Sequence, residues 1–373
     1  MNVREDFRRD GLAAHFLADE TLIALACKVL PGSKINIGYP AICEKEYEKC
    51  SRIVNHASND LTELCVVGHA REDHLNKMAE IIKNSYNVTA NSWIPISDYF
   101  LNQTVRVSSK EVFSGLKSIV QKWKQKSDKP FDIAFADCTS NEKELLPRIY
   151  NWTDYCLNNG TRNVIICDTR GIGKPEQIES IFSMLNVFGN RIEFHPHNDN
   201  GNALENIALA LDKGVETIGT SFYGAGERQS MIDPKELISF GLSFNEYKFK
   251  EFEKKYFEMI GNPLEVIKTV YGLNVIVTGS QYRLRGRNKN LKIKFGVTSD
   301  TYIASKIFGK NIDAKELSEL KDSLLYAEKN IVLTPNELFV KLRTGYFRDI
   351  ITPKQSNLGR LSVISQEAGI QNG

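Results

Sequence analysis

Short apolar segments recur through the first two thirds of the chain, and each is followed by a stretch whose apolar residues repeat with helical spacing. Strands that alternate with helices predict a parallel sheet, because parallel neighbours need a crossover connection. Eight such units in about 240 residues predict an α/β protein with a (β/α)8 TIM barrel. The predicted strands are residues 3–8, 34–39, 63–69, 87–94, 131–137, 162–168, 191–197 and 215–221.

A doubly wound parallel sheet would use the same alternation of strands and helices. Such a sheet usually has fewer units and often carries a glycine-rich phosphate loop after its first strand. The sequence has no convincing GxGxxG motif in that position. The pattern therefore favours the closed barrel.

Polar residues follow the apolar strands at their carboxyl ends, where a barrel of this kind places its active site. They are Arg9, Asp10, Asn36, His69, Arg71, Asn91, Ser97, Asp137, Thr139, Asp168, Thr169, His195, His197, Thr220 and Ser221. Charged and hydrogen-bonding groups gathered at one end of otherwise apolar strands indicate an active-site mouth.

Two histidines end the seventh predicted strand in the segment HPHNDNGN. His195 and His197 are two residues apart, so their side chains share one face of a strand. Imidazoles bind divalent metals, and Asp10 at the end of the first strand comes close once the barrel closes. The spacing predicts a two-histidine, one-aspartate metal site with open positions. The alternative is one packed and one solvated histidine with no shared ligand.

Composition excludes several classes of partner. The net charge of +2 gives no case for nucleic acid or an anionic membrane. No run of about 18 apolar residues is present, so no transmembrane helix is expected. The charged start MNVREDFRRDG lacks the apolar centre of a signal peptide. Seven cysteines without a CxxC pair predict reduced thiols in a cytoplasmic protein.

Several motifs occur in the order and spacing of a known family. They are RRDG, INIGYPA, IPISDYFL, FADCTS, ICDTRGIGKPE, HPHNDNGNALENIALALDKG and GTSFYGAGER. Together they resemble the isopropylmalate synthase and homocitrate synthase family, within the metallolyase barrels that include hydroxymethylglutaryl-CoA lyase. Residues 292–342 resemble the helical subdomain that comes after the barrel in those synthases.

The resemblance implies a metal-dependent acyltransferase. Such an enzyme condenses an acyl-CoA, usually acetyl-CoA, with a 2-oxo acid and releases CoA and a 2-hydroxy dicarboxylic acid. Asp10, His195 and His197 match the metal ligands, for zinc, magnesium or manganese. Arg9 matches the catalytic arginine that holds the oxyanion or carboxylate, and Thr169 matches a contact to the substrate carboxylate. By their position at the mouth, Asn36, Arg71, Ser97 and Asp137 are further substrate-binding candidates.

The sequence departs from the family pattern at several positions, which include much of the proton-transfer apparatus and, at Met231, a frequent neighbour of the metal. The departures are Leu12, Ala13, Asn36, Phe100, Ala136, Met231 and Gln281. Alanine, asparagine and glutamine cannot act as strong bases at neutral pH. His15 and His69 are the candidate replacement bases, and His69 is the one assigned to catalysis.

Three functions remain open on the sequence. The first is the condensation on an unusual substrate, the second is a metal-dependent carbon–carbon lyase or aldolase, and the third is a metal-binding paralogue with little catalysis. The expected organisation is a barrel at 1–242, a linker subdomain at 243–290, a small helical subdomain at 291–345 and a tail at 346–373. The resemblance also implies a homodimer. The C-terminal regulatory domain of full isopropylmalate synthases is not expected, because too few residues follow the helical subdomain.

Overall fold

The computed structural model describes most of the barrel region and short parts of the chain after the barrel. The described residues are 1–8, 20–57, 62–104, 106–225, 231–260, 275–277, 291–293, 301, 304–305, 309 and 311–326. The chain divides into two compact units, residues 1–332 and 333–373, and the second lies outside the described residues.

Eight parallel strands form a closed barrel in which each strand pairs with its neighbours in the chain and β8 pairs with β1. The strands are β1 (Asn2–Glu5), β2 (Lys34–Gly38), β3 (Glu63–His69), β4 (Val88–Pro95), β5 (Phe131–Ala136), β6 (Val164–Asp168), β7 (Ile192–Pro196) and β8 (Thr217–Thr220). The predicted (β/α)8 barrel is confirmed, and every strand lies within a few residues of its predicted range.

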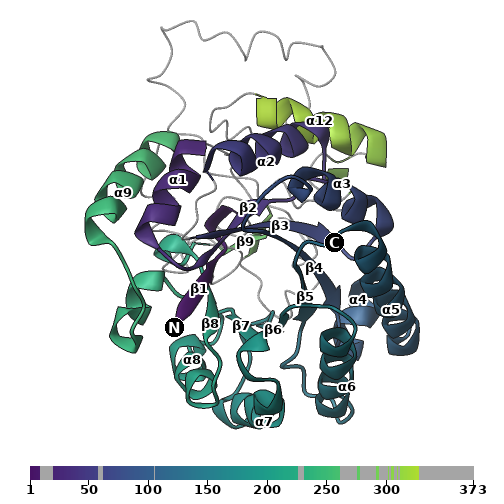
Figure 1. The fold of residues 1–373 in the computed structure, drawn as a ribbon. Coiled ribbons are helices and arrows are strands. Elements are labelled where there is room, and N and C mark those ends of the chain that lie inside the picture. Colours follow the sequence, from purple (N-terminus) through teal and green to yellow (C-terminus); the bar gives the residue numbers. More distant parts are fainter. Residues whose placement is uncertain are drawn as a thin grey trace, which may run out of the picture. The chain divides into compact units, whose positions relative to one another are not determined.

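Helices surround the barrel in chain order (Figure 1). They are α1 (Glu20–Val29), α2 (Glu44–Ala57), α3 (Glu72–Ile82), α4 (Asp98–Thr104), α5 (Ser109–Lys126), α6 (Leu145–Asn158), α7 (Pro175–Leu185) and α8 (Ala203–Asp212). Short 3₁₀ helices lie at η2 (Asn186–Arg191), η3 (Phe222–Gly224) and η4 (Pro234–Phe240). The helix expected after the last strand is therefore a 3₁₀ helix, and α4 is an additional helix between β4 and α5.

Local sequence explains these elements. All six residues of β5, FDIAFA, are buried, as expected for a strand covered on both faces. The helix α5 begins at a capping box in which Ser108 and Glu111 satisfy each other's backbone N–H groups. Its buried residues Leu116, Ile119 and Trp123 recur with helical spacing and pack toward the barrel.

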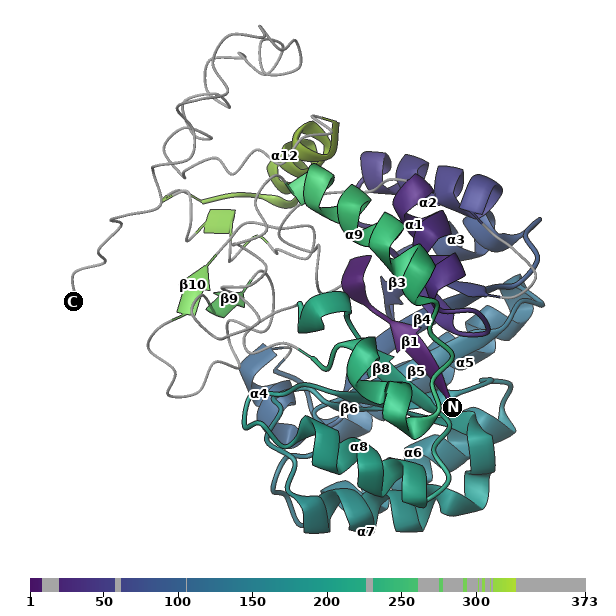
Figure 2. The ribbon, with the colours of Figure 1, turned by 90° about the vertical axis from the view of Figure 1, so that its left-hand side faces the viewer.

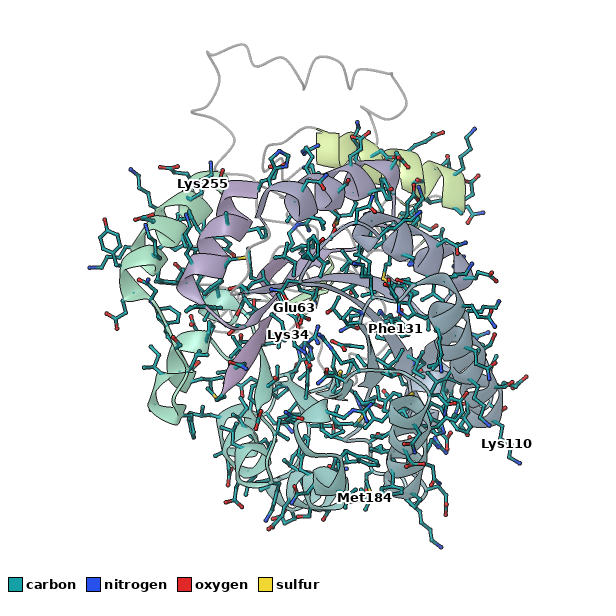
Figure 3. The ribbon with its side chains drawn as sticks, in the orientation of Figure 1. Lys34, Glu63, Lys110, Phe131, Met184 and Lys255 are labelled. Atoms are coloured by element: carbon teal, nitrogen blue, oxygen red, sulfur yellow. The ribbon has the colours of Figure 1, made fainter. Side chains whose placement is uncertain are left out.

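Charged side chains fill the amino-terminal end of the barrel interior, which we call the barrel floor. It consists of three cations and three carboxylates: Arg4, Lys34, Arg162, Glu63, Asp132 and Glu193. Figure 3 shows Lys34 and Glu63 near the barrel centre, whereas Lys110 and Met184 lie on the outer helices.

Each carboxylate of the barrel floor meets at least one cation. Arg4 Nε lies 2.7 Å from Glu193, and Arg4 Nη2 lies 2.6 Å from Asp132. Arg162 Nη2 contacts both Glu63 and Asp132, at 2.7 and 2.8 Å. Burial alone would raise the pKa of Asp132, but the neighbouring cations outweigh it and hold that pKa well below its usual range. The charges of the floor therefore compensate one another.

Two helices that follow the barrel in the chain pack on its first two helices. The helix α9 (Glu246–Ile260) lies beside α1, and α12 (Ala314–Tyr326) lies beside α2 (Figure 2). Asp322 of α12 accepts a hydrogen bond from the backbone N–H of Lys45 at 2.9 Å. Strands β9 (Val275–Val277) and β10 (Leu291–Ile293) form a separate parallel pair. The subdomain boundaries expected from the sequence stay predictions.

No helix among the described residues is long and apolar enough to span a bilayer.

Candidate functional site

His195 of β7 and His197, directly after β7, lie side by side. The ring centroids of His195 and His197 are 5.3 Å apart, and each residue is 3% exposed. This arrangement confirms the shared face that their i, i+2 spacing predicts. The two imidazoles are therefore buried close neighbours.

Asp6, which comes just after β1, orients the first of these rings. Its Oδ2 lies 3.0 Å from His195 Nδ1, and its Oδ1 accepts a hydrogen bond of 2.5 Å from Asn36 Nδ2. A carboxylate on one ring nitrogen of a histidine fixes the tautomer and directs the other nitrogen toward a metal. The contact therefore makes Nε2 of His195 the nitrogen suited to coordination.

A cavity lies inside the barrel between His195 and the barrel floor. Its volume is about 20 Å³, roughly the room that a single water molecule needs, and it continues into unfilled space that opens to solvent. The described residues that line it are Arg4, Asp6, Asn36, Val67, Asn91, Trp93, Ala134, Ile165, Cys167 and His195. Because β7 and β3 are four strands apart in the closed barrel, His195 and Val67 face each other across its axis. A small molecule held by the histidines would extend toward β3 and β4.

A second polar group surrounds Asp137, directly after β5. Arg170 Nε lies 2.7 Å from Asp137 Oδ1, and Ser97 Oγ donates a hydrogen bond to Oδ2. The backbone N–H of Asp137 donates to Thr169 Oγ1 at 2.8 Å. The structure thus brings together the predicted residues Ser97, Asp137 and Thr169. They are outside the described lining of the cavity.

Asp168 fixes the loop after β6. It accepts hydrogen bonds from Thr139 Oγ1 at 2.5 Å and from the backbone N–H groups of Ile172 and Gly173 at 3.0 and 2.9 Å. Burial raises the pKa of this carboxyl, while its hydrogen bonds oppose that shift. The buried Asp168 carboxyl therefore fixes the backbone of the loop that carries Thr169 and Arg170.

His69 ends β3 at the mouth, next to aromatic neighbours. Its ring centroid lies 5.0 Å from that of Trp93 and 4.9 Å from that of His74. Burial, together with His74 and then Lys321 of α12, lowers the pKa of His69 to about 3. The ring is therefore uncharged at neutral pH, and such a low pKa makes it a weak base.

Arg71 lies on the surface and not in the cavity. Its guanidinium pairs with Asp73 at 2.9 Å, and the two side chains are 68% and 60% exposed. Because the group is well solvated and already paired, a bound molecule inside the barrel does not reach it in this arrangement.

Several predicted residues fall outside the described part of the chain. They are Arg9, Asp10, His15, Gln281 and the segment 226–230. Within the described residues, no group of three His, Cys, Asp or Glu side chains is placed to hold a metal ion. The third ligand assigned from the motifs, Asp10, belongs to the undescribed set, so the complete ligand set stays a prediction.

Sequence reasoning missed four residues of this region: Asp6, Trp93, Arg170 and Lys321. The alternation of Arg4 and Asp6 along β1 was a usable signal, because both side chains then face the interior. Trp93 faces the interior by the same rule. Lys321 had no such signal, because its position depends on how α12 packs against α2.

A family profile matches most of the barrel. The profile described as HMGL-like matches residues 17–239. The chain belongs to the HMGL-like family. This assignment confirms the resemblance that the ordered motifs indicated. It covers the part of the chain that contains seven of the eight barrel strands.

Curated relatives of this HMGL-like chain are synthases. It is 23% identical over 317 residues to 2-isopropylmalate synthase 1 of Caldanaerobacter subterraneus subsp. tengcongensis, covering 79% of this chain and 78% of that protein. It is 24% identical over 306 residues to the 2-isopropylmalate synthase of Buchnera aphidicola subsp. Cinara cedri, covering 76% and 58%. Homocitrate synthase AksA of Methanopyrus kandleri is 27% identical over 252 residues, covering 65% and 60%. The chain thus spans less than two thirds of the latter two proteins.

Solved structures support the fold. An HMG-CoA lyase from Acinetobacter baumannii, in complex with coenzyme A and 3-methylmalate, superposes with a TM-score of 0.59 at 16% identity. The match covers 78% of this chain and 97% of the lyase. The HMG-CoA lyase of Pseudomonas aeruginosa gives a TM-score of 0.56 at 12% identity, covering 70% and 92%. At these identities the likeness establishes the barrel architecture alone.

Proposed function

We propose that this protein catalyses a metal-dependent condensation of an acyl-CoA, with acetyl-CoA as the expected donor, and a 2-oxo acid. Water then hydrolyses the thioester of the condensed acid, so the products are CoA and a 2-hydroxy dicarboxylic acid. The observation that carries the proposal is the buried pair His195 and His197, of which His195 lines the cavity and has Asp6 on its Nδ1. The named activities of the curated relatives support the same reaction class.

The donor set suits a divalent ion. Two imidazoles on one face of β7 and a carboxylate from the segment after β1 form a mixed nitrogen and oxygen set, which accepts zinc, magnesium or manganese. In the proposal His195, His197 and Asp10 hold the ion. Such an ion supplies Lewis-acid polarisation of a keto group.

The chain's own residues bind and orient the substrates. Arg9 holds the oxyanion or carboxylate through its guanidinium fork. Asn36 lies in the cavity beside Asp6, and Thr169 stands next to Asp137 at the mouth. The ion pair of Asp137 with Arg170 keeps that wall of the mouth in place.

His69 takes part in the proposal as an uncharged group at the mouth. Its pKa of about 3 keeps it neutral through the physiological range. A neutral imidazole both donates and accepts a hydrogen bond, so it can position a carbonyl or receive a proton from an acidified carbon. Its weak basicity predicts a slow proton-transfer step.

The decisive test is release of CoA thiol from acetyl-CoA by the full chain with divalent metal and a panel of 2-oxo acids. We expect metal-dependent release with at least one acid and loss of it in His197→Ala and in Asp10→Ala. His56→Ala is the matched control, because His56 is exposed on α2 and contacts only its own helix among the described residues.

Absence of CoA release with every acid, in a protein that binds metal through His197, rejects the condensation. The same preparations would then be tested for cleavage of 2-hydroxy acids, which is the reverse carbon–carbon chemistry. The homodimer that belongs to the proposal is measured separately as the molar mass in solution.

A further inference from the structure

Asn91 faces the cavity with a hydrogen-bonding group that the described protein leaves unused. It lies on β4, is 5% exposed and lines the same cavity as His195. Within the described residues its carboxamide takes part in no hydrogen bond. A carboxamide offers two N–H donors and an acceptor oxygen, and buried polar groups are normally paired. The side chain is therefore available to a molecule in the cavity.

A second unused acceptor lies nearby. Asn36 is 1% exposed, and its Nδ2 donates to Asp6. Its Oδ1 accepts no hydrogen bond from any residue that the structure describes. The cavity wall thus contains two carboxamides, on β2 and β4, with unsatisfied hydrogen-bonding capacity.

The cation at the base of the cavity is already neutralised. Arg4 donates from Nε and Nη2 to Glu193, from Nη2 to Asp132 and from Nη1 to Cys65 Sγ. Four of its five N–H groups are occupied, and two carboxylates face its charge. Among the described lining residues Arg4 is the one arginine or lysine, so this wall offers a ligand carboxylate no uncompensated positive charge.

The remaining wall is mainly apolar. Val67, Ala134 and Ile165 line it together with the Trp93 indole. These side chains suit the carbon atoms of a short chain and do not bind its polar end. A purely aliphatic end would leave the Asn91 carboxamide buried and unpaired, which disfavours binding.

We propose that the 2-oxo acid taken by this site has a short side chain that ends in an uncharged hydrogen-bonding group, a hydroxyl or a carboxamide, and that Asn91 binds that group. This inference rests on the proposed function, since it assumes that the oxo acid is anchored at His195 and His197. It adds the class of substrate, which the family assignment leaves open.

Three acids of the same heavy-atom skeleton test the inference. They are 2-oxosuccinamate, 4-methyl-2-oxopentanoate and oxaloacetate, which differ in having an amide, two methyl groups or a carboxylate at the far end. Their dissociation constants are measured by calorimetry with the metal-loaded full chain. We expect 2-oxosuccinamate to bind about tenfold more tightly than either of the others, the effect of one well-placed hydrogen bond.

Two variants locate the effect. Asn91→Leu keeps the size of the side chain and removes its polar atoms, so 4-methyl-2-oxopentanoate should become the preferred ligand. Ser92→Ala is the control, because Ser92 is the next residue of the same strand and does not line the cavity. It should keep the wild-type order of affinities. The comparison of the three acids on wild-type protein needs no variant, so poor folding of Asn91→Leu does not prevent a decision.

The possible failures are distinct. If the methyl or the carboxylate acid binds as tightly as the amide and supports CoA release, the proposed function stands and the inference about Asn91 is overturned. If the preference for the amide persists in Asn91→Leu, Asn91 is rejected as the partner. If no acid binds and no CoA is released, the proposed function and this inference fail together.

Discussion

Gly219 of β8 leaves room for the ring of His195 on β7. A Cβ built at Gly219 would lie 2.7 Å from His195 Nδ1, closer than real Cβ atoms approach a neighbour, and a tight 3.1 Å from its Cα. The backbone at this position needs no positive φ, so the requirement for glycine is one of space alone. The sequence of β8, TIGT, therefore contributes to the position of a histidine on the neighbouring strand.

We predict that Gly219→Ala displaces the His195 ring from Asp6. The overpacking should cost about 1–3 kcal/mol of unfolding free energy, and the displaced ligand should weaken metal binding about 10- to 100-fold. Denaturant unfolding of the metal-free protein and metal titration measure the two effects. Gly115→Ala on α5 is the control, because a Cβ there meets no atom within 4 Å. Unchanged metal affinity in Gly219→Ala would contradict the role assigned to His195.

Removal of Arg4 should lower the unfolding free energy of the barrel. The carboxylates of Asp132 and Glu193 are 0% and 1% exposed, and loss of their shared partner leaves buried charge uncompensated. Arg4→Met should lower the unfolding free energy by about 3–5 kcal/mol. Lys122→Met, which removes a pair with Glu72 on the exposed surface, should change it by less than about 1 kcal/mol. An equal loss of unfolding free energy in the two variants would show that Arg4 contributes no more to stability than an exposed ion pair does.

The titration of His69 predicts how stability depends on pH. Its pKa is about 3 in the folded chain and about 6.5 when unfolded, so below pH 6.5 the unfolded chain binds a proton that the folded chain does not. The unfolding free energy should therefore fall as the pH is lowered from about 6.5 toward about 3. His69→Phe keeps a ring beside Trp93 and should make this fall shallower by up to about 1.4 kcal/mol per pH unit.

Denaturant unfolding at a series of pH values measures that slope. His56→Phe serves as the comparison, since it is the same substitution at an exposed position on α2. A slope in His69→Phe that equals the wild-type slope would mean that His69 titrates normally. His74, whose pKa burial also lowers, accounts for the dependence that should remain.

The backbone of Asp137 is in the left-handed region, with φ of 70°. Asparagine tolerates this conformation better than alanine does, and its amide oxygen can still accept from Arg170. Asp137→Asn should therefore be more stable than Asp137→Ala by about 1 kcal/mol or more. Thermal and denaturant unfolding of the two variants measure the difference. Equal stability would mean that neither the strained backbone nor the contact to Arg170 distinguishes them.

The barrel could be predicted because its signal is local. Each apolar segment is bounded by polar residues, so its length can be read from the local sequence. The helical spacing of the apolar residues after it can be read in the same way. The position of His195 beside His197 follows from strand periodicity alone. These features need no knowledge of which strands meet.

The contacts of the site could not be predicted in the same way, because they depend on register and docking. Asp6 meets His195 only because of how β1 and β7 are staggered on either side of β8. Burial is the main cause of the low pKa of His69, followed by His74, and Lys321 adds to it only once α12 has packed on α2. Arg71 lies at the surface because its guanidinium pairs with Asp73 there and so does not turn toward the barrel interior.

All seven cysteines are buried and carry free thiols. Burial raises the pKa of Cys27, Cys65 and Cys156 to about 12, so at neutral pH they are neither accessible nor ionised. A colorimetric thiol reagent added to the folded protein should therefore report released CoA against a low background. Once denaturant opens the chain, the same reagent should count seven protein thiols. The rate at which they appear would time the opening of the barrel without any introduced label.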